Sequence, residues 1–182
     1  MRRNSLLGFS LVELLVAIAI VAILVAAAFP SFEGSMRRNR LATTTNELIA
    51  SVSLARSEAI RSTDGGGICA SADGVACGSD WNAGWLVWVD GGDVAANHGT
   101  FQSASDTVVR VVNAHPRLVL TAANAAAAPV DRIGFDYRGR PVTGTSTTFE
   151  LKPDTCPAGQ ELVRDLAINV SGQIVNQKRV CP

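Results

Sequence analysis

The sequence has few aromatic residues and no excess of charge of either sign. Aromatic residues make up 5% of its 182 residues, and 16 Lys and Arg residues balance 16 Asp and Glu residues. A chain with no net charge lacks the general electrostatic footprint of a nucleic-acid-binding protein. Composition therefore gives no reason to expect a nucleic acid as the partner.

Recognisable catalytic and metal-binding patterns are also missing. No CxxC spacing occurs, so a zinc site would depend on help from His98 and His115. Neither histidine lies beside a GxSxG or comparable nucleophile signal. Asp90, Asp93 and His98 share a glycine-rich segment, but their spacing matches no calcium or zinc loop. We therefore expect neither an enzyme nor a cofactor.

What the chain does have is one long apolar segment near its start. The uncharged run at 14–29 is roughly sixteen residues long, and a helix over 9–32 would measure about 36 Å, enough to cross a bilayer once. Arg2 and Arg3 precede it, so the positive-inside rule places residues 1–8 in the cytoplasm and the remainder outside. Three further arginines at positions 37, 38 and 40 are a weaker signal in the opposite sense.

A secretory signal peptide is the alternative for this segment, with a cut after Ala28. Glu13 argues against it, because a charge in the apolar region opposes insertion. A carboxylate at the bilayer centre costs a few kcal/mol, so a chain that retains one there is expected to pair it with a partner's charge.

The residues Gly8-Phe9-Ser10-Leu11-Val12-Glu13 resemble the class III signal of type IV prepilins and type II secretion pseudopilins. The resemblance implies cleavage between Gly8 and Phe9 by an inner-membrane prepilin peptidase, N-methylation of the new Phe9 amine, and polymerisation of the helix into a filament core. In that family the glutamate that Glu13 matches is held to neutralise the terminal amine of a neighbouring subunit. Two buried opposite charges cost far less together than either does alone.

The helix is expected to continue beyond the apolar run. Prepilins commonly carry a proline near the place of Pro30, whose missing N–H and ring clash predict a kink; a helix end near Phe29 is the alternative. Further apolar residues then recur at helical spacing and predict an amphipathic helix that stops at the turn formers of 62–67. They are Leu41, Leu48, Val52, Ala55 and Ala59.

The rest of the chain reads as short β-branched runs separated by turns, at 85–89, 107–112, 118–121, 132–137, 148–151, 162–170 and 173–180. We predict an α+β fold: a long N-terminal transmembrane and amphipathic helix packed on an antiparallel, β-sandwich-like head. Trp85 and Trp88 should lie on opposite faces of their strand, and 122–129 should be a surface connection. The expected domains are a leader at 1–8, the helix at 9–63 with its transmembrane part at 9–32, and the head at 64–182.

A second resemblance begins within the helix. Residues 54–60, read as LARSEAI, and the pattern Trp81-x-x-Gly84-Trp85-x-x-Trp88-x-Asp90 are similar to the group of H-type minor pseudopilins and minor pilins known as GspH, FimT and FimU. It implies other minor and major pilins or pseudopilins as partners. It also implies a single-pass inner-membrane protein, with its head in the periplasm, that later enters a pilus or pseudopilus filament.

All four cysteines follow the helix, on the side assigned to the periplasm, where an even number predicts disulfides. Three pairings are possible. We favour Cys69 with Cys77, which closes a glycine-rich loop, and Cys156 with Cys181, which ties the terminus to an upstream loop.

Some FimT-like minor pilins bind DNA through a C-terminal Gly-Arg-x-Arg motif. This chain reads Gly172-Gln173-Ile174-Val175 at the matching place and lacks both arginines. Lys178 and Arg179 lie farther along, and Arg138 and Arg140 belong to a different turn, so DNA is a possible but less favoured partner. The sequence thus predicts a minor pilin that primes a type IV pilus or sits in its tip, with an H-type pseudopilin of type II secretion and a DNA receptor as alternatives.

Overall fold

The computed structural model describes residues 9–92 and 98–182, without the side chains of residues 27–31. Gly8 and Asp93 therefore lie outside the described residues. The chain divides into two compact units, Met1–Asn39 and Arg40–Pro182, and each is described by itself below.

One helix, α1 (Leu11–Ser62), passes through both units. It begins where Ser10 can cap it, because the Ser10 hydroxyl oxygen accepts a hydrogen bond from the Glu13 N–H at 3.2 Å. The helix continues through Pro30, so the helix end near Phe29 does not occur, whereas the kink stays a prediction. Among the described residues, no helix combines the length and apolar character needed to span a membrane.

The second half of α1 buries the face that its apolar spacing predicts. Each of the five predicted apolar residues is at most 2% exposed, namely Leu41, Leu48, Val52, Ala55 and Ala59. Buried hydroxyls on the same side bond within the helix: Thr45 Oγ1 donates to the Leu41 carbonyl at 2.6 Å, and Ser51 Oγ to the Glu47 carbonyl at 2.8 Å. Because these polar groups find partners locally, the face can enter the head's core without an unpaired hydroxyl.

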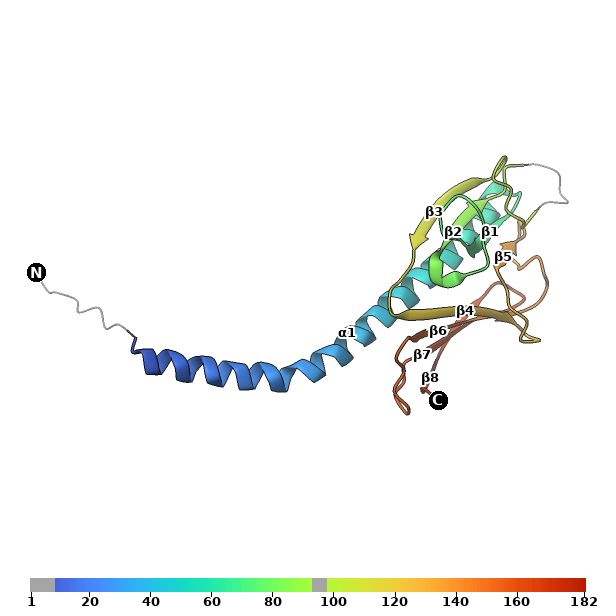
Figure 1. The fold of residues 1–182 in the computed structure, drawn as a ribbon. Helices are drawn as coiled ribbons and strands as arrows, with labels where there is room; N and C mark the ends of the chain where they lie inside the picture. The colour runs from blue at the N-terminus through green and yellow to red at the C-terminus, as the bar shows by residue number, and fades with distance from the viewer. Residues whose placement is uncertain (1–8, 93–97) are drawn as a thin grey trace, which may run out of the picture. The chain divides into compact units, whose positions relative to one another are not determined.

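The head contains two four-stranded antiparallel sheets within the described residues (Figure 1). The first has the order β3-β2-β1-β5 and the second the order β4-β6-β7-β8. The strands are β1 (Gly66–Ala70), β2 (Gly84–Val89), β3 (Thr107–Asn113), β4 (Leu118–Asn124), β5 (Arg132–Phe135), β6 (Thr147–Pro153), β7 (Val163–Ile168) and β8 (Ile174–Arg179), with a short 3-10 helix at Trp81–Ala83. The observed architecture confirms the predicted α+β fold.

A single main core joins the helix to both sheets. The first sheet contributes Ile68, Trp85 and Phe135, and the second contributes Phe149 and Leu166. Trp88 instead belongs to a smaller cluster with Cys69 and Leu86. The two tryptophans of β2 therefore lie on opposite faces of the strand, as its period of two predicts.

Two segments of the head differ from the sequence prediction. The sequence prediction counts Gly66 and Gly67 among the turn formers that end the helix and assigns no strand to 68–70, yet both glycines belong to β1, a central strand of its sheet. A Cβ at Gly67 would lie 2.5 Å from the Ile133 carbonyl oxygen and 2.5 Å from the ring of Trp88. The glycine thus permits a close approach inside a strand. The alanine-rich connection begins later than predicted, because residues 122–124 still belong to β4.

Replacing Gly67 with alanine is expected to lower the free energy of unfolding by about 1–3 kcal/mol, because the added methyl group must displace the Trp88 ring or the Ile133 backbone. Chemical unfolding of the full chain in detergent measures this. Gly78→Ala is the matched control, since the nearest atom to its Cβ would lie 3.9 Å away. Equal stability of the two variants would contradict the close-packing role of Gly67.

Candidate functional site

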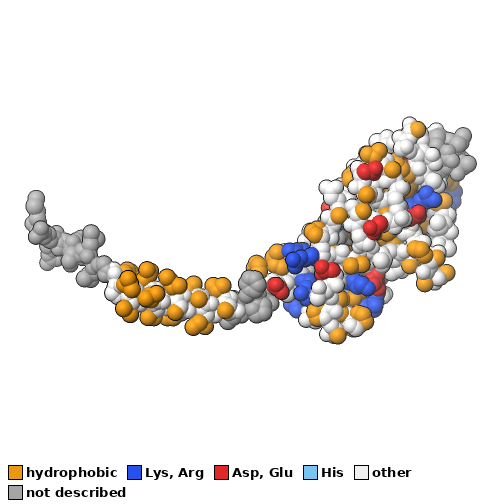
Figure 2. Space-filling model, in the orientation of Figure 1, with side chains coloured by type: hydrophobic (Ala, Val, Ile, Leu, Met, Phe, Trp, Pro, Cys, Tyr) orange, Lys and Arg blue, Asp and Glu red, His pale blue; other side chains and the backbone are white. Residues whose placement is uncertain are grey.

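The first unit presents an apolar helix surface. Phe9 is 80% exposed, and many large apolar side chains of the following helix are also exposed. They include Leu11, Val12, Leu14, Leu15, Val16, Ile18, Ile20, Val21, Ile23, Leu24 and Val25. Figure 2 shows apolar side chains along the visible face of this helix. A helix that is apolar all round is one that is covered in its working state by a lipid or by other helices.

Glu13 is the one acidic residue in the first turn of this helix, and its side chain is exposed. No ion pair joins it to any of the described residues. Ser10 and Glu13 have the spacing of a capping box, so the carboxylate also lies where the positive end of the helix dipole favours a negative charge. Sequence analysis missed this second role, although the Ser-x-x-Glu spacing reveals it. Gly8, the other side of the predicted cut, lies outside the described residues.

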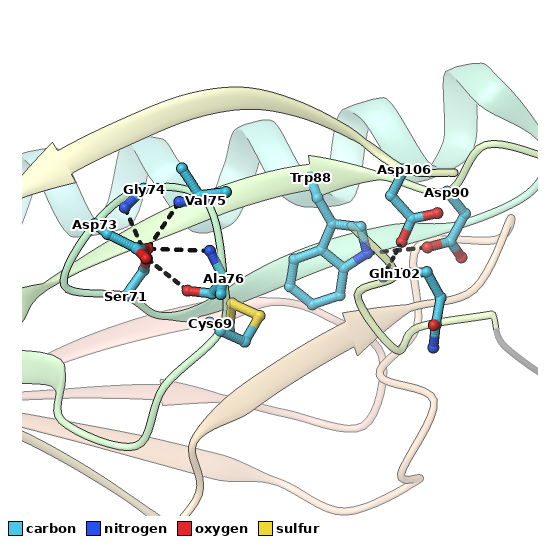
Figure 3. Close-up of a disulfide and its surroundings, with 11 residues drawn as sticks. Cys69, Ser71, Asp73, Gly74, Val75, Ala76, Trp88, Asp90, Gln102 and Asp106 are labelled. Carbon is cyan, nitrogen blue, oxygen red and sulfur yellow. Dashed lines mark hydrogen bonds between the residues drawn. A yellow bond between two sulfur atoms is a disulfide. The ribbon is translucent and has the colours of Figure 1, made fainter. Parts of the chain in front are cut away.

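Both favoured disulfides are present in the head. Cys69 and Cys77 close the loop after β1, which Figure 3 shows to be held by hydrogen bonds. The Asp73 carboxylate accepts from the N–H groups of Val75 at 2.9 Å and Ala76 at 3.0 Å. These two bonds lower the pKa of Asp73 below its usual value. These hydrogen bonds therefore hold the loop in a defined conformation, although it contains glycine.

The second disulfide joins Cys156, in the loop after β6, to Cys181 at the end of the chain. Cys181 is 2% exposed and belongs to the main core. Its N–H donates to the Gln160 carbonyl at 2.8 Å, and its own carbonyl accepts from the Gly159 N–H at 3.2 Å. The C-terminus is thus held by backbone bonds as well as by the bridge.

Of the four candidate DNA-contacting cations, Arg179 is neutralised by its own sheet. Its Nε donates to Asp165 at 2.8 Å, and its Nη2 donates to both Asp165 and Glu150. Hydrogen bonds to Asp165 and Glu150 raise the pKa of Arg179 further above its already high value. The pKa of Glu150 is lowered, chiefly by a hydrogen bond from Lys152 and also by one from Arg179. These bonds outweigh the partial burial of Glu150, which acts to raise its pKa.

The other three candidates differ in their contacts: Lys178 directly precedes Arg179, whereas Arg138 and Arg140 lie in a different turn. Arg140 forms an ion pair with Asp136 at 2.9 Å, and the guanidinium carbon of Arg138 lies 4.9 Å from the centre of the Tyr137 ring. The Lys178 side chain is exposed and makes no hydrogen bond or ion pair with the described residues. Arg140 and Arg179 are therefore already paired with carboxylates, which a DNA phosphate would have to displace.

Asp90 has a structural role. It is 4% exposed, and its two carboxylate oxygens accept hydrogen bonds from Trp88 Nε1 and from the Gly99 N–H, each at 2.9 Å. Burial is the main cause that raises the pKa of this carboxyl group. The described residues contain no group of three side chains able to hold a metal ion.

A methylation-type N-terminus on an apolar helix, followed by a disulfide-linked head of two antiparallel sheets, defines the class of pilin-like filament subunits. Residues 4–29 match the prokaryotic N-terminal methylation motif. Residues 44–172 match the family described as type II transport protein GspH, so the chain belongs to this family.

Two crystal structures of the type IV minor pilin FimU from Pseudomonas aeruginosa are similar to this chain. One has 26% identity and a TM-score of 0.52, covering 80% of this chain and 90% of that chain. The other has 25% identity and a TM-score of 0.50, covering 74% and 90% respectively. No curated protein matches the sequence.

The chain is a minor pilin or pseudopilin of the GspH/FimU type. Its family and fold are those of structural filament subunits rather than of enzymes. Membership implies association with other pilins or pseudopilins, and the methylation motif implies a protein that is first anchored in a membrane and later associated with a filament.

Proposed function

We propose that the chain is a minor pilin that primes assembly of a type IV pilus or sits in its tip complex. The observation that carries this proposal is the similarity to the type IV minor pilin FimU across most of the chain. In this proposal the apolar helix is held in the inner membrane with the head in the periplasm until the subunit enters the filament. The four-cysteine head suits that oxidising compartment.

An H-type minor pseudopilin of a type II secretion system is the second candidate, favoured by the match of residues 44–172 to the family of type II transport protein GspH. A deletion strain distinguishes the two machines. Loss of surface pili and twitching, with normal exoprotein secretion, supports the pilus proposal. Loss of secretion with normal piliation supports the alternative, and restoration by the intact gene is the control in both cases.

The mature chain is expected to begin at N-methylated Phe9, because Gly8 is the glycine at the cytoplasmic edge of the apolar run. Mass spectrometry of the N-terminal peptide measures both cleavage and methylation. Gly8→Leu should leave the leader in place, because the small residue at the predicted cut is lost. A mature terminus near Phe29 would indicate a secretory signal peptide and overturn the prepilin proposal.

DNA binding by the head is expected to be weak. Two of its four candidate cations are paired with carboxylates, and the Gly-Arg-x-Arg position holds Gln173 and Val175. A gel-shift titration of the full chain in detergent at low and physiological salt tests this. Micromolar or tighter binding at physiological salt, lost when Lys178 and Arg179 become alanine, with a salt slope of about one unit per phosphate contact, would support the DNA receptor instead.

A further inference from the structure

Two of the four sheet edges in the described part of the head are covered by the chain itself, and a third is irregular. At the edge of β5, the Val142 N–H donates to the Gly134 carbonyl at 2.9 Å. At the edge of β4, the Val130 N–H donates to the Ala122 carbonyl at 3.0 Å. Strand β3 carries a register shift opposite residues 87 and 88, and irregularities of this kind disfavour further strand pairing.

Strand β8 forms the fourth edge, and among the described residues it has neither a covering segment nor a register shift. It pairs with β7 in continuous register from Val163↔Arg179 to Ile168↔Ile174. The hairpin between β7 and β8 starts with a hydrogen bond from the Asn169 N–H to the Gln173 carbonyl. Hydrogen-bonded and non-bonded residue pairs alternate along an antiparallel ladder. The backbone N–H and C=O groups of residues 174, 176 and 178 therefore point away from β7. No backbone hydrogen bond from these three residues to the remaining described chain is recorded.

A groove of about 470 Å³ lies beside the start of this free edge, between α1 and β8. Ile49 and Ile60 of the helix and Ile174 of the strand supply its apolar lining. Ile60 is 45% exposed although the residue before it, Ala59, is fully buried in the main core. A strand added next to β8 would direct alternate side chains toward this groove, because the side-chain period of a strand is two.

The same edge carries positive charge that the described chain does not neutralise. Arg56, in the groove, donates to the backbone carbonyls of Gly139 at 2.9 Å and Ser171 at 3.2 Å rather than to a carboxylate. The Lys178 side chain forms no ion pair with the described residues. The neighbouring carboxylates are already used: Asp136 by Arg140, and Asp165 by Arg179.

We propose that β8 receives an extended segment of a neighbouring, different pilin subunit as an additional strand. The segment places apolar side chains in the groove and acidic side chains at Arg56 and Lys178. It satisfies both the N–H and the C=O groups of the free edge, which a nucleic-acid phosphate cannot do because it only accepts hydrogen bonds. A second copy of β8 would bring a second set of cations to the same edge. This inference rests on the proposed assembly of the chain with other pilins.

Photo-crosslinking of the full chain in filament-producing cells tests the proposal. A benzophenone amino acid at Asn176 is expected to label an acidic, extended segment of another pilin subunit, identified by mass spectrometry of the linked peptides. The same probe at Thr121, an exposed residue of β4, is the positional control. Linkage of Asn176 to DNA, to a second copy, or to no macromolecule while the chain is present in purified filaments would overturn strand addition. Absence of the chain from filaments would instead count against the proposed function.

Two variants connect the crosslink to the free edge. Asn176→Pro removes an outward N–H without removing a bond to β7, and Lys178→Glu reverses the unpaired charge; each is expected to lower the crosslink from a probe at Ile174 at least about tenfold. Arg132→Glu makes the same charge change on an exposed residue of β5 and should leave the yield unchanged. Circular dichroism of each variant verifies the fold. Unchanged crosslinking in folded Asn176→Pro and Lys178→Glu chains would contradict the proposal.

Discussion

A chain with lysine in place of Glu13 is expected to be inserted and processed at Gly8 but to be almost absent from filaments. In the proposed filament, residue 13 lies among apolar helices, and we expect a carboxylate there to be tolerated only beside an opposite charge such as a neighbour's terminal amine. Lysine would instead meet that amine with a like charge. Breaking a buried pair costs about 3–5 kcal/mol, which corresponds to a decrease in incorporation of more than about a hundredfold. Immunoblotting of sheared filaments against whole-cell protein measures the ratio.

Glu33→Lys is the matched control, because it makes the same charge change in the same helix at an exposed position twenty residues farther along. It should be incorporated almost normally. Glu13→Gln separates charge from shape and should resemble the lysine variant, although less severely. Normal incorporation of Glu13→Lys and Glu13→Gln would refute the pairing role and leave Glu13 only its place in the helix cap.

The helix of this chain could be predicted because its signals are local. The spacing of Leu41, Leu48, Val52, Ala55 and Ala59 identifies one face of a helix, and all five are buried. The proposed assembly segment is also local, since Gly8, Phe9 and Glu13 lie within six consecutive residues. A peptidase of the proposed kind would read a short, contiguous segment, which is why the sequence alone is enough to propose this part of the function.

Sheet order and edge exposure could not be predicted in the same way, because they depend on residues far apart in the chain. Strand β1 pairs with both β2 and β5, and its glycine is explained by Trp88 and Ile133 rather than by its own neighbours. The pairing of Arg179 with Asp165 and Glu150 likewise depends on strand register. In sequence, Arg179 looks like a free cation, whereas in the sheet it is neutralised.

Removing the Cys156–Cys181 bridge is expected to have the largest effect on stability. The bridge spans 25 residues, for which the loop-closure relation gives about 3.5 kcal/mol, or a fall in melting temperature of about 10 °C. The closed loop contains β7 and β8, so loss of the bridge leaves the end of the edge strand held to the Cys156 loop by the backbone bonds of Cys181. Thermal unfolding of the Cys156→Ser, Cys181→Ser chain in detergent measures the loss.

Cys69→Ser, Cys77→Ser is the matched comparison, because it removes a bridge that spans only 8 residues. The same relation gives about 2.5 kcal/mol for this smaller loop. Hydrogen bonds from the N–H groups of Val75 and Ala76 to Asp73 keep the loop ordered without the sulfur link, and the observed loss should therefore fall below that value. A larger loss from the short bridge than from the long one would show that packing around Cys69, rather than chain entropy, dominates the contribution of these disulfides.

Cys69 is fully buried beside Leu86 and Trp88, so serine at this position would leave a hydroxyl group in an apolar cluster. The Cys69→Ala, Cys77→Ala chain distinguishes that cost from the loss of the bridge.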